Sequence, residues 1–170
     1  LTKARLPWLV LALFGGFISV KVLGLYEPAM QIHPELFFFT PLVAAMAGNV
    51  GVQSSAIIVQ GLANNALSGS LFNRLLKEFS LSLLNGFILA ILLIIGSYFL
   101  LNIDVKIGIT VSLALLSVII MASLIGTFIP IVLDKYGIDP ALATGPFITT
   151  SNDIMGIIIF FTIAKAILGF

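Results

Sequence analysis

Residues 140–164 read PALATGPFITTSNDIMGIIIFFTIA, and this stretch decides the fold because Asp153 is its only charged residue. About 20 apolar residues in succession span the hydrocarbon core of a bilayer. A carboxylate inside such a span costs about 2.5–3.5 kcal/mol on insertion scales and marks a functional site by default. The stretch therefore predicts a transmembrane helix that carries a functional carboxylate.

The composition of the whole chain extends this prediction. Of the 170 residues, 60% are hydrophobic and only 9% are charged, with a mean hydropathy of +1.22, whereas about 25% of the residues of soluble domains are charged. Long uncharged stretches separate the charges along the sequence. We therefore predict an all-α membrane protein, with residues 1–170 as a single transmembrane domain. Its five transmembrane helices are expected at about 7–26, 36–64, 75–101, 106–133 and 140–168.

The segments between these helices have their own signals. Residues 27–35 contain two prolines and are predicted to form a connection, and residues 64–77 combine turn residues with a short amphipathic piece. Pro7 and Pro140 suit the first turn of a helix. Arg74, Lys77 and Glu78 are expected to anchor the helix at 75–101 in the membrane interface.

Orientation follows from the Lys and Arg residues beside the spans, because cytoplasmic loops are richer in them. Five lie on one side, namely Lys3, Arg5, Arg74, Lys77 and Lys135, whereas Lys106 and Lys165 lie on the other and Lys21 is inside the first helix near that end. We therefore expect a multi-pass protein of the cell membrane with a cytoplasmic N-terminus and an external C-terminus.

Several functional classes are disfavoured by the residues that the chain lacks. It has no cysteine, so it offers no disulfide, thiolate metal site or thiol redox chemistry. A net charge of +1 without a basic run gives no reason to expect nucleic acid as a partner. An intramembrane aspartyl hydrolase needs two carboxylates that share a proton, and only Asp153 lies deep in a span. We expect the chain not to be an enzyme.

Polar residues surround Asp153 in a way that is unusual for a spanning helix. Asp153 lies thirteen residues beyond Pro140, which places it about 20 Å along the helix. Thr149 lies one turn earlier on the same face, and Asn152 is adjacent. Pro146 lacks an N–H and frees a backbone carbonyl, while Gly145 allows close approach of an ion.

The helix at 36–64 repeats this pattern. Pro41 frees the carbonyl of Phe37, and the stretch that follows contains Gly48, Asn49, Gly51 and Gln53. Irregular backbone at membrane depth is tolerated only where it is buried in protein or lines a watery cavity. We therefore expect the helix to be interrupted at Pro41 and to line one pathway together with the helix at 140–168.

The donor types indicate a hard cation. Carboxylate, amide and carbonyl oxygens suit Mg²⁺ and Ca²⁺, and the only histidine, His33, lies in a connection. One carboxylate cannot neutralise a divalent ion, but two copies of Asp153 across a two-fold axis can. Five spans also cannot divide into two equal repeats, so a homodimer would supply the missing symmetry.

Other interpretations remain open at this point. Asp153 can form a structural ion pair, with Lys21 or Lys165 as partner, and Gly48 with Gly51 can serve helix packing. Glu27 and Glu35 can attract cations at the external mouth or can be plain exposed loop residues.

Two motifs carry a family resemblance. Pro41 is followed by Gly48-Asn49-Val50-Gly51-Val52-Gln53-Ser54, and Gly137-Ile138-Asp139-Pro140-Ala141 is followed by Pro146, Asp153 and Gly156. Over essentially its whole length the chain resembles the transmembrane domain of the MgtE family of magnesium channels and transporters. The family often has Asn at the position of Val52, Asn at Gly145, Ala at Thr149 and Ser at Asn152.

The resemblance implies a homodimer whose central pore is lined by the helices at 36–64 and 140–168. It also implies that Asp153 of both protomers recognises hydrated Mg²⁺ together with backbone carbonyls. Family members typically carry cytoplasmic regulatory domains before the membrane part. None is present in this chain, which starts without Met, so we expect that they were either removed or are naturally absent.

These observations together predict transport of Mg²⁺ as the carried ion, with Mn²⁺, Co²⁺ and Ca²⁺ as further candidates, by a homodimer in the lipid bilayer. The expected metal site contains Asp153, Thr149, Gly48 and Asn49. The expected pore-lining or gating residues are Gly145, Pro146, Asn152, Gly51, Gln53 and Pro41. The alternatives are a carrier that couples the ion to H⁺ or Na⁺ and a structural membrane module without transport.

Overall fold

The computed structural model describes residues 2–67 and 69–170, apart from the side chains of residues 142 and 143. The described residues form helices and no strands. Five of the helices are long and apolar enough to cross a membrane. This confirms the predicted all-α fold with five candidate spans. The helices are α1 (Thr2–Gly24), α2 (Glu27–Ile32), α3 (Pro34–Ala63), α4 (Leu71–Leu101), α5 (Val105–Lys135) and α6 (Pro140–Leu168).

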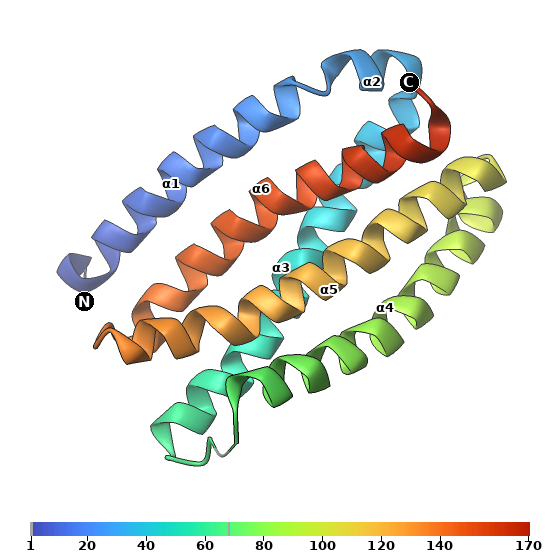
Figure 1. Ribbon diagram of the computed structural model, residues 1–170. Coiled ribbons are helices and arrows are strands. Elements are labelled where there is room, and N and C mark those ends of the chain that lie inside the picture. Colours follow the sequence, from blue (N-terminus) through green and yellow to red (C-terminus); the bar gives the residue numbers. More distant parts are fainter. Residues whose placement is uncertain (1, 68) are drawn as a thin grey trace.

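The five long helices run up and down beside one another, and α5 is central among them (Figure 1). Helix α5 packs against α3, α4 and α6, α3 also packs against α6, and α1 rests on α6. The N-terminus lies at the end of the bundle where α3 leads to α4 and α5 leads to α6. Helix α2 and the C-terminus lie at the opposite end (Figure 1).

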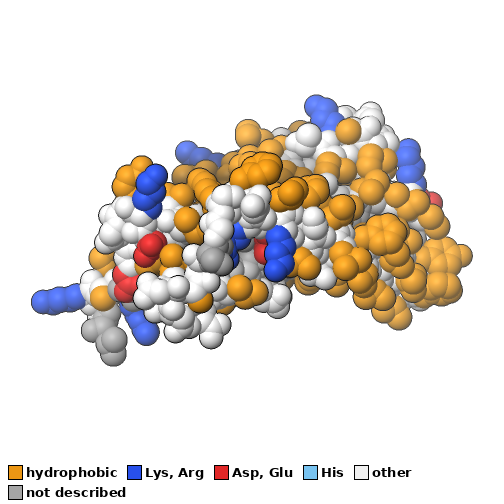
Figure 2. All heavy atoms as spheres, turned by 60° about the horizontal axis from the view of Figure 1, so that its bottom comes forward, with side chains coloured by type: hydrophobic (Ala, Val, Ile, Leu, Met, Phe, Trp, Pro, Cys, Tyr) orange, Lys and Arg blue, Asp and Glu red, His pale blue; other side chains and the backbone are white. Residues whose placement is uncertain are grey.

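Apolar side chains occupy both the inside and the outside of the bundle. Val111, Val118 and Phe160 are fully buried, as expected of a core. On the outside, Phe14, Phe87 and Phe99 are more than half exposed. Figure 2 shows hydrophobic side chains over much of the visible surface, with charged side chains scattered between them. A surface of this kind suits hydrocarbon rather than water.

Two glycines bring the central helices into backbone contact. A Cβ atom on Gly126 of α5 would collide with the carbonyl oxygen of Gly51 on α3. A Cβ atom on Gly51 would in turn collide with the side chains of Asn152 and Ile148 on α6. Small residues drive the association of membrane helices by allowing such approaches. Gly51 and Gly126 therefore fix how closely α3 sits against α5 and α6.

The ends of some elements differ from the predicted ones. Helix α1 begins at Thr2 and contains Pro7, and residues 27–32 form the short helix α2 where we expected a connection. The separate amphipathic piece expected within 64–77 is absent from its described part, because α4 begins at Leu71 after Ser70, whose hydroxyl accepts a hydrogen bond from the backbone N–H of Asn73. Ser68 of that segment lies outside the described residues.

The expected interruption at Pro41 is wrong, since α3 continues through it as a helix, and α6 likewise continues through Pro146. The hydroxyl of Thr40 donates a hydrogen bond to the carbonyl of Phe37, which is the carbonyl that Pro41 leaves without its N–H partner. Neighbouring hydroxyls commonly repair a membrane helix at proline in this way. The carbonyl of Phe37 is therefore occupied and is not a free ion ligand.

Candidate functional site

A hollow of about 650 Å³ lies between α3 and α6. Its polar lining consists of Gly48, Asn49 and Gln53 from α3 and of Thr149 and Asp153 from α6. All four residues expected to hold a metal are therefore brought together, with one of the residues expected to line the pathway. The remaining lining residues are Ala44, Ala45 and Val52, which are small or aliphatic.

The hollow lies halfway along both helices. Asn49 is about 22 Å from the start of α3 at Pro34, and Asp153 is about 20 Å from the start of α6 at Pro140. Because the two helices run in opposite directions (Figure 1), these positions meet at the middle of the bundle. The polar groups therefore sit where the hydrocarbon core of a bilayer is deepest.

The polar side chains of the hollow are not buried within a single chain. Asn49, Gln53 and Thr149 are exposed, and Asp153 is partly buried. Lys21 and Lys165, the lysines considered as structural partners of Asp153, are exposed and are not among the residues that line the hollow. Polar groups at this depth require water or another protein surface rather than lipid.

The oxygen atoms of the hollow are arranged to accept rather than to donate. The hydroxyl of Thr149 donates to the carbonyls of Gly145 and Pro146, at 3.1 and 3.2 Å, so its lone pairs remain available to the hollow. Gly48 has no atom within 4 Å of the place where a Cβ would stand, which leaves open space beside Asn49. The lining thus offers acceptors to a cation or to the water molecules around one.

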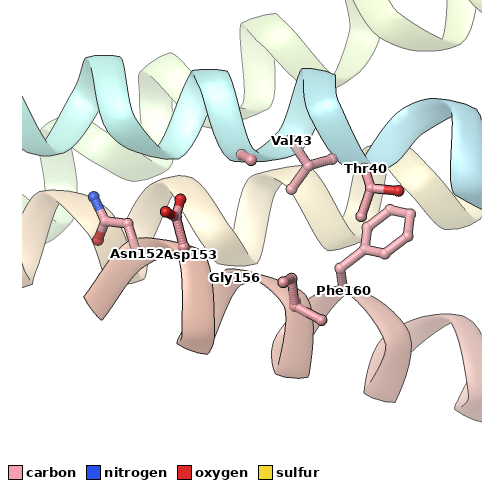
Figure 3. Close-up of a pocket in the computed structure, with 8 residues that line it drawn as sticks. Thr40, Val43, Asn152, Asp153, Gly156 and Phe160 are labelled. Carbon is pink, nitrogen blue, oxygen red and sulfur yellow. The ribbon is translucent and has the colours of Figure 1, made fainter. Parts of the chain in front are cut away.

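Asn152, which is expected to line the pore, lies with Asp153 in the lining of a small pocket between α3 and α6. Figure 3 shows Asn152 and Asp153 pointing from α6 toward α3, and Asn152 is fully buried there. Its side-chain amide donates a 2.9 Å hydrogen bond to the carbonyl of Ala47. Asn152 therefore ties α6 to α3 directly beside Asp153, and it acts as a positioning residue.

Asn152→Leu is expected to lower the thermal midpoint of the purified protein, because it removes this interhelical hydrogen bond. Such bonds average about 0.6 kcal/mol in membrane proteins, so a shift of about 1–3 °C should follow. Ser80→Ala is the control, since that exposed hydroxyl bonds only to its own helix at Leu76. Equal midpoints for Asn152→Leu and Ser80→Ala would contradict the positioning role.

The other residues expected at the site lie outside the lining of the hollow. Gly51 is buried in the contact of α3 with α5 and α6, which favours the packing interpretation for this glycine but not for Gly48. Pro41 and Gly145 are exposed and Pro146 is partly buried. Glu27 and Glu35 begin α2 and α3 at the end of the bundle that holds the C-terminus.

Glu78, which is expected to anchor the membrane interface, also makes contacts that the sequence did not predict. Its carboxylate accepts hydrogen bonds from Ser54 of α3 and Ser123 of α5. A charge at the edge of an uncharged stretch gives no hint of this contact, because the two serines lie far away in the sequence.

The donor set favours a hard, hydrated cation. The polar side chains of the hollow offer a carboxylate, amides and a hydroxyl, which are the oxygen ligands that Mg²⁺ and Ca²⁺ prefer. The described residues contain no group of three or more His, Cys, Asp or Glu side chains that could hold a metal. One chain therefore offers a single carboxylate rather than a closed cage, which suits an ion that keeps its water molecules.

Comparison of the sequence with known proteins relates the chain to cation transporters. Residues 40–163 match the model of the MgtE family, which is described as a divalent cation transporter. The chain is 39% identical over 163 residues to the magnesium transporter MgtE of Bacillus subtilis and 37% identical over 164 residues to that of Enterococcus faecalis. It is 30% identical over 166 residues to the magnesium transporter MgtE of Thermus thermophilus.

These alignments cover 95%, 95% and 97% of the chain but 36% of each relative, so the chain spans about a third of their length. The relatives are named as transporters, in agreement with the expectation that the chain is not an enzyme. The family match covers the hollow from Ala44 to Asp153. This chain therefore belongs to the MgtE family of divalent cation transporters.

Proposed function

We propose that this protein carries Mg²⁺ across the cell membrane through a pore on the two-fold axis of a homodimer, with Asp153 of both protomers at the ion site. The observation that carries the proposal is the polar hollow of α3 and α6, which contains Asp153 at mid-depth and opens on the outside of the single chain. The names of the relatives support Mg²⁺ as the ion.

The argument for a dimer is physical. Asn49 and Gln53 are exposed halfway along a spanning helix, where contact with lipid is costly. A second copy that faced the first across the hollow would exclude lipid from both amides. It would also supply the second carboxylate that a divalent ion needs for neutralisation.

The hollow has room for a hydrated ion. Six water molecules occupy about 180 Å³ at about 30 Å³ each, and one protomer alone offers about 650 Å³. Mg²⁺ gives up its water reluctantly. Asp153 would supply the negative charge, while Asn49, Thr149 and the open backbone at Gly48 would contact the bound water. Gly145, Pro146 and Pro41 remain proposed gating positions.

The direction of movement follows from orientation. The basic residues at the start of α1, at the start of α4 and at the end of α5 support a cytoplasmic N-terminus by the positive-inside tendency. A membrane potential that is negative inside then drives a divalent ion inward with about 4.6 kcal/mol per 100 mV. We therefore propose flow down the electrochemical gradient without a coupled ion.

Flux through vesicles that contain the full-length protein tests this proposal. We expect Mg²⁺ entry, read by a dye inside the vesicles, to rise when a K⁺ gradient with valinomycin makes the interior negative, with no H⁺ or Na⁺ gradient present. Protein-free vesicles provide the baseline. Entry that required an H⁺ or Na⁺ gradient at fixed voltage would instead identify a coupled carrier, and entry equal to the baseline would remove the transport proposal.

A further inference from the structure

A second acidic centre lies between α3, α4 and α5. The Oε1 atom of Glu78 is 2.6 Å from the hydroxyl of Ser54 and 2.5 Å from the hydroxyl of Ser123, and the two hydroxyls are 3.2 Å apart. Three oxygen atoms from three different helices therefore form a small triangle. Because both serines reach the same carboxylate oxygen, neither supplies a donor to Oε2.

The triangle lies within the bundle rather than at its rim. Glu78 is about 10 Å from the start of α4, and Ser123 is about 18 Å from the end of α5. A carboxylate that is partly buried between apolar helices loses part of its hydration, which is costly unless hydrogen bonds compensate for it. Leu and Ile at these positions would pack the same helices without that cost, so packing alone does not account for Glu78.

A cavity of about 150 Å³ adjoins the triangle. Its polar lining includes Gln53, Ser82 and Asn85 besides Glu78 and the two serines, and its described lining contains no Lys or Arg. At about 30 Å³ per water molecule the cavity has room for about five. The space thus offers one negative charge, several oxygen acceptors and room for water.

The cavity is a neighbour of the Asp153 hollow. Gln53 lines both spaces, and Ser54 is only about 8 Å farther along α3 than Asn49. The second space lies on the side toward the end of α3 and the start of α4, which is the end of the bundle that holds the N-terminus (Figure 1). Gln53 is thus the residue through which the lining of the two spaces is continuous.

The three oxygen atoms are hydrogen-bonded to one another and could share one small divalent cation once the two shorter edges of their triangle lengthen by about 0.4–0.5 Å. Oxygen ligands at about 2.1 Å in an octahedron lie about 3.0 Å from one another, and the triangle has edges of 2.5, 2.6 and 3.2 Å. A cation on the cavity side of this triangle would contact the carboxylate and both serine oxygens. The serine protons would then turn away, and retained water molecules would reach the amides of Gln53 and Asn85.

We infer that Glu78, Ser54 and Ser123 form a second divalent cation site in each protomer, beside the Asp153 hollow on its way to the N-terminal end. The inference rests on the proposed transport function only for the identity of the ion. Unlike the Asp153 site, which needs two protomers for one ion, this site takes its side chains from one chain, and its single carboxylate leaves a net charge of +1 on a bound divalent ion.

Mn²⁺ binding by the full-length protein in nanodiscs tests the inference, with equilibrium dialysis and metal analysis as the readout. The Asp153→Asn background removes the first site. Adding Glu78→Gln, which keeps the side-chain shape, is expected to remove about one further Mn²⁺ per protomer. Asp134→Asn in the same background is the control, since Asp134 is exposed at the end of α5, and it should leave the count unchanged.

A double change of Ser54→Ala and Ser123→Ala keeps the charge and tests the site independently if the Glu78 variant does not fold. It is expected to weaken Mn²⁺ binding at this site at least about tenfold. An unchanged Mn²⁺ count in a folded Glu78→Gln variant would overturn the inference and leave Glu78 as a structural hydrogen-bond acceptor. That result would leave the transport proposal unaffected. The transport proposal is tested separately by Mg²⁺ entry into vesicles that contain the unsubstituted protein.

Discussion

Asp153→Asn is expected to lower Mg²⁺ flux into vesicles at least about a hundredfold at subsaturating Mg²⁺. A carboxylate about 4 Å from a unit positive charge contributes about 4 kcal/mol at an effective dielectric constant of about 20. Each 1.4 kcal/mol is a factor of ten in affinity, so the loss of the charge alone removes most ion occupancy. The amide of Asn keeps the shape of the side chain and its place in the hollow.

Two matched variants separate charge from other effects. Asp134→Asn makes the same chemical change at an exposed residue outside the hollow, and its flux should equal that of the unsubstituted protein. Asp153→Glu keeps the charge but lengthens the side chain, so intermediate flux is expected. Full flux through a well-folded Asp153→Asn protein would refute the role of Asp153 at the ion site.

Dimers that carry one Asp153→Asn protomer and one unsubstituted protomer test the pairing itself. They can be isolated with two different affinity tags. If both carboxylates hold one ion, the mixed dimer should conduct well below half of the normal flux, because its single pore has lost one charge. A flux of half the normal value would indicate that each protomer conducts alone, which contradicts a shared pore.

The fold was predictable because the bilayer restricts the options. A chain in hydrocarbon must satisfy its backbone hydrogen bonds within each segment. An uncharged stretch of about 25 residues therefore predicts a transmembrane helix. The polar face of the site was predictable for a related reason. Asn49, Gln53 and Asp153 are too costly to face lipid, and helical periodicity places Thr149 on the same face as Asp153.

The direction in which each polar side chain points could not be predicted from the sequence. Asn152 and Asp153 are adjacent, yet one is buried against Ala47 and the other lines the hollow. Gly48 likewise lines the hollow, whereas Gly51 is buried in the contact of α3 with α5 and α6. One helical position rotates a side chain by about 100°, so the roles depend on which neighbour each face meets. The contact of Glu78 with Ser54 and Ser123 could not be predicted for the same reason, since it depends on which helices face one another.

Gly126→Ala is expected to destabilise the protein strongly, although Ala is the better helix former by about 1 kcal/mol. The added methyl group would collide with the carbonyl of Gly51, and this atom belongs to a helix backbone that cannot rotate away. Overpacking of this kind costs about 1–3 kcal/mol or more. The thermal midpoint of the purified protein should therefore fall by about 4 °C or more.

The control for this prediction is Gly96→Ala in α4, where no atom lies within 4 Å of the added Cβ. This variant should be as stable as the unsubstituted protein or slightly more stable, because only helix propensity changes. Gly126→Ala should also reduce Mg²⁺ flux, since α3 must move away from α5 and thereby shifts Asn49 relative to Asp153. Equal midpoints for the two alanine variants would contradict the prediction. They would show that the close contact of α3 with α5 does not hold α3 in its place beside α6.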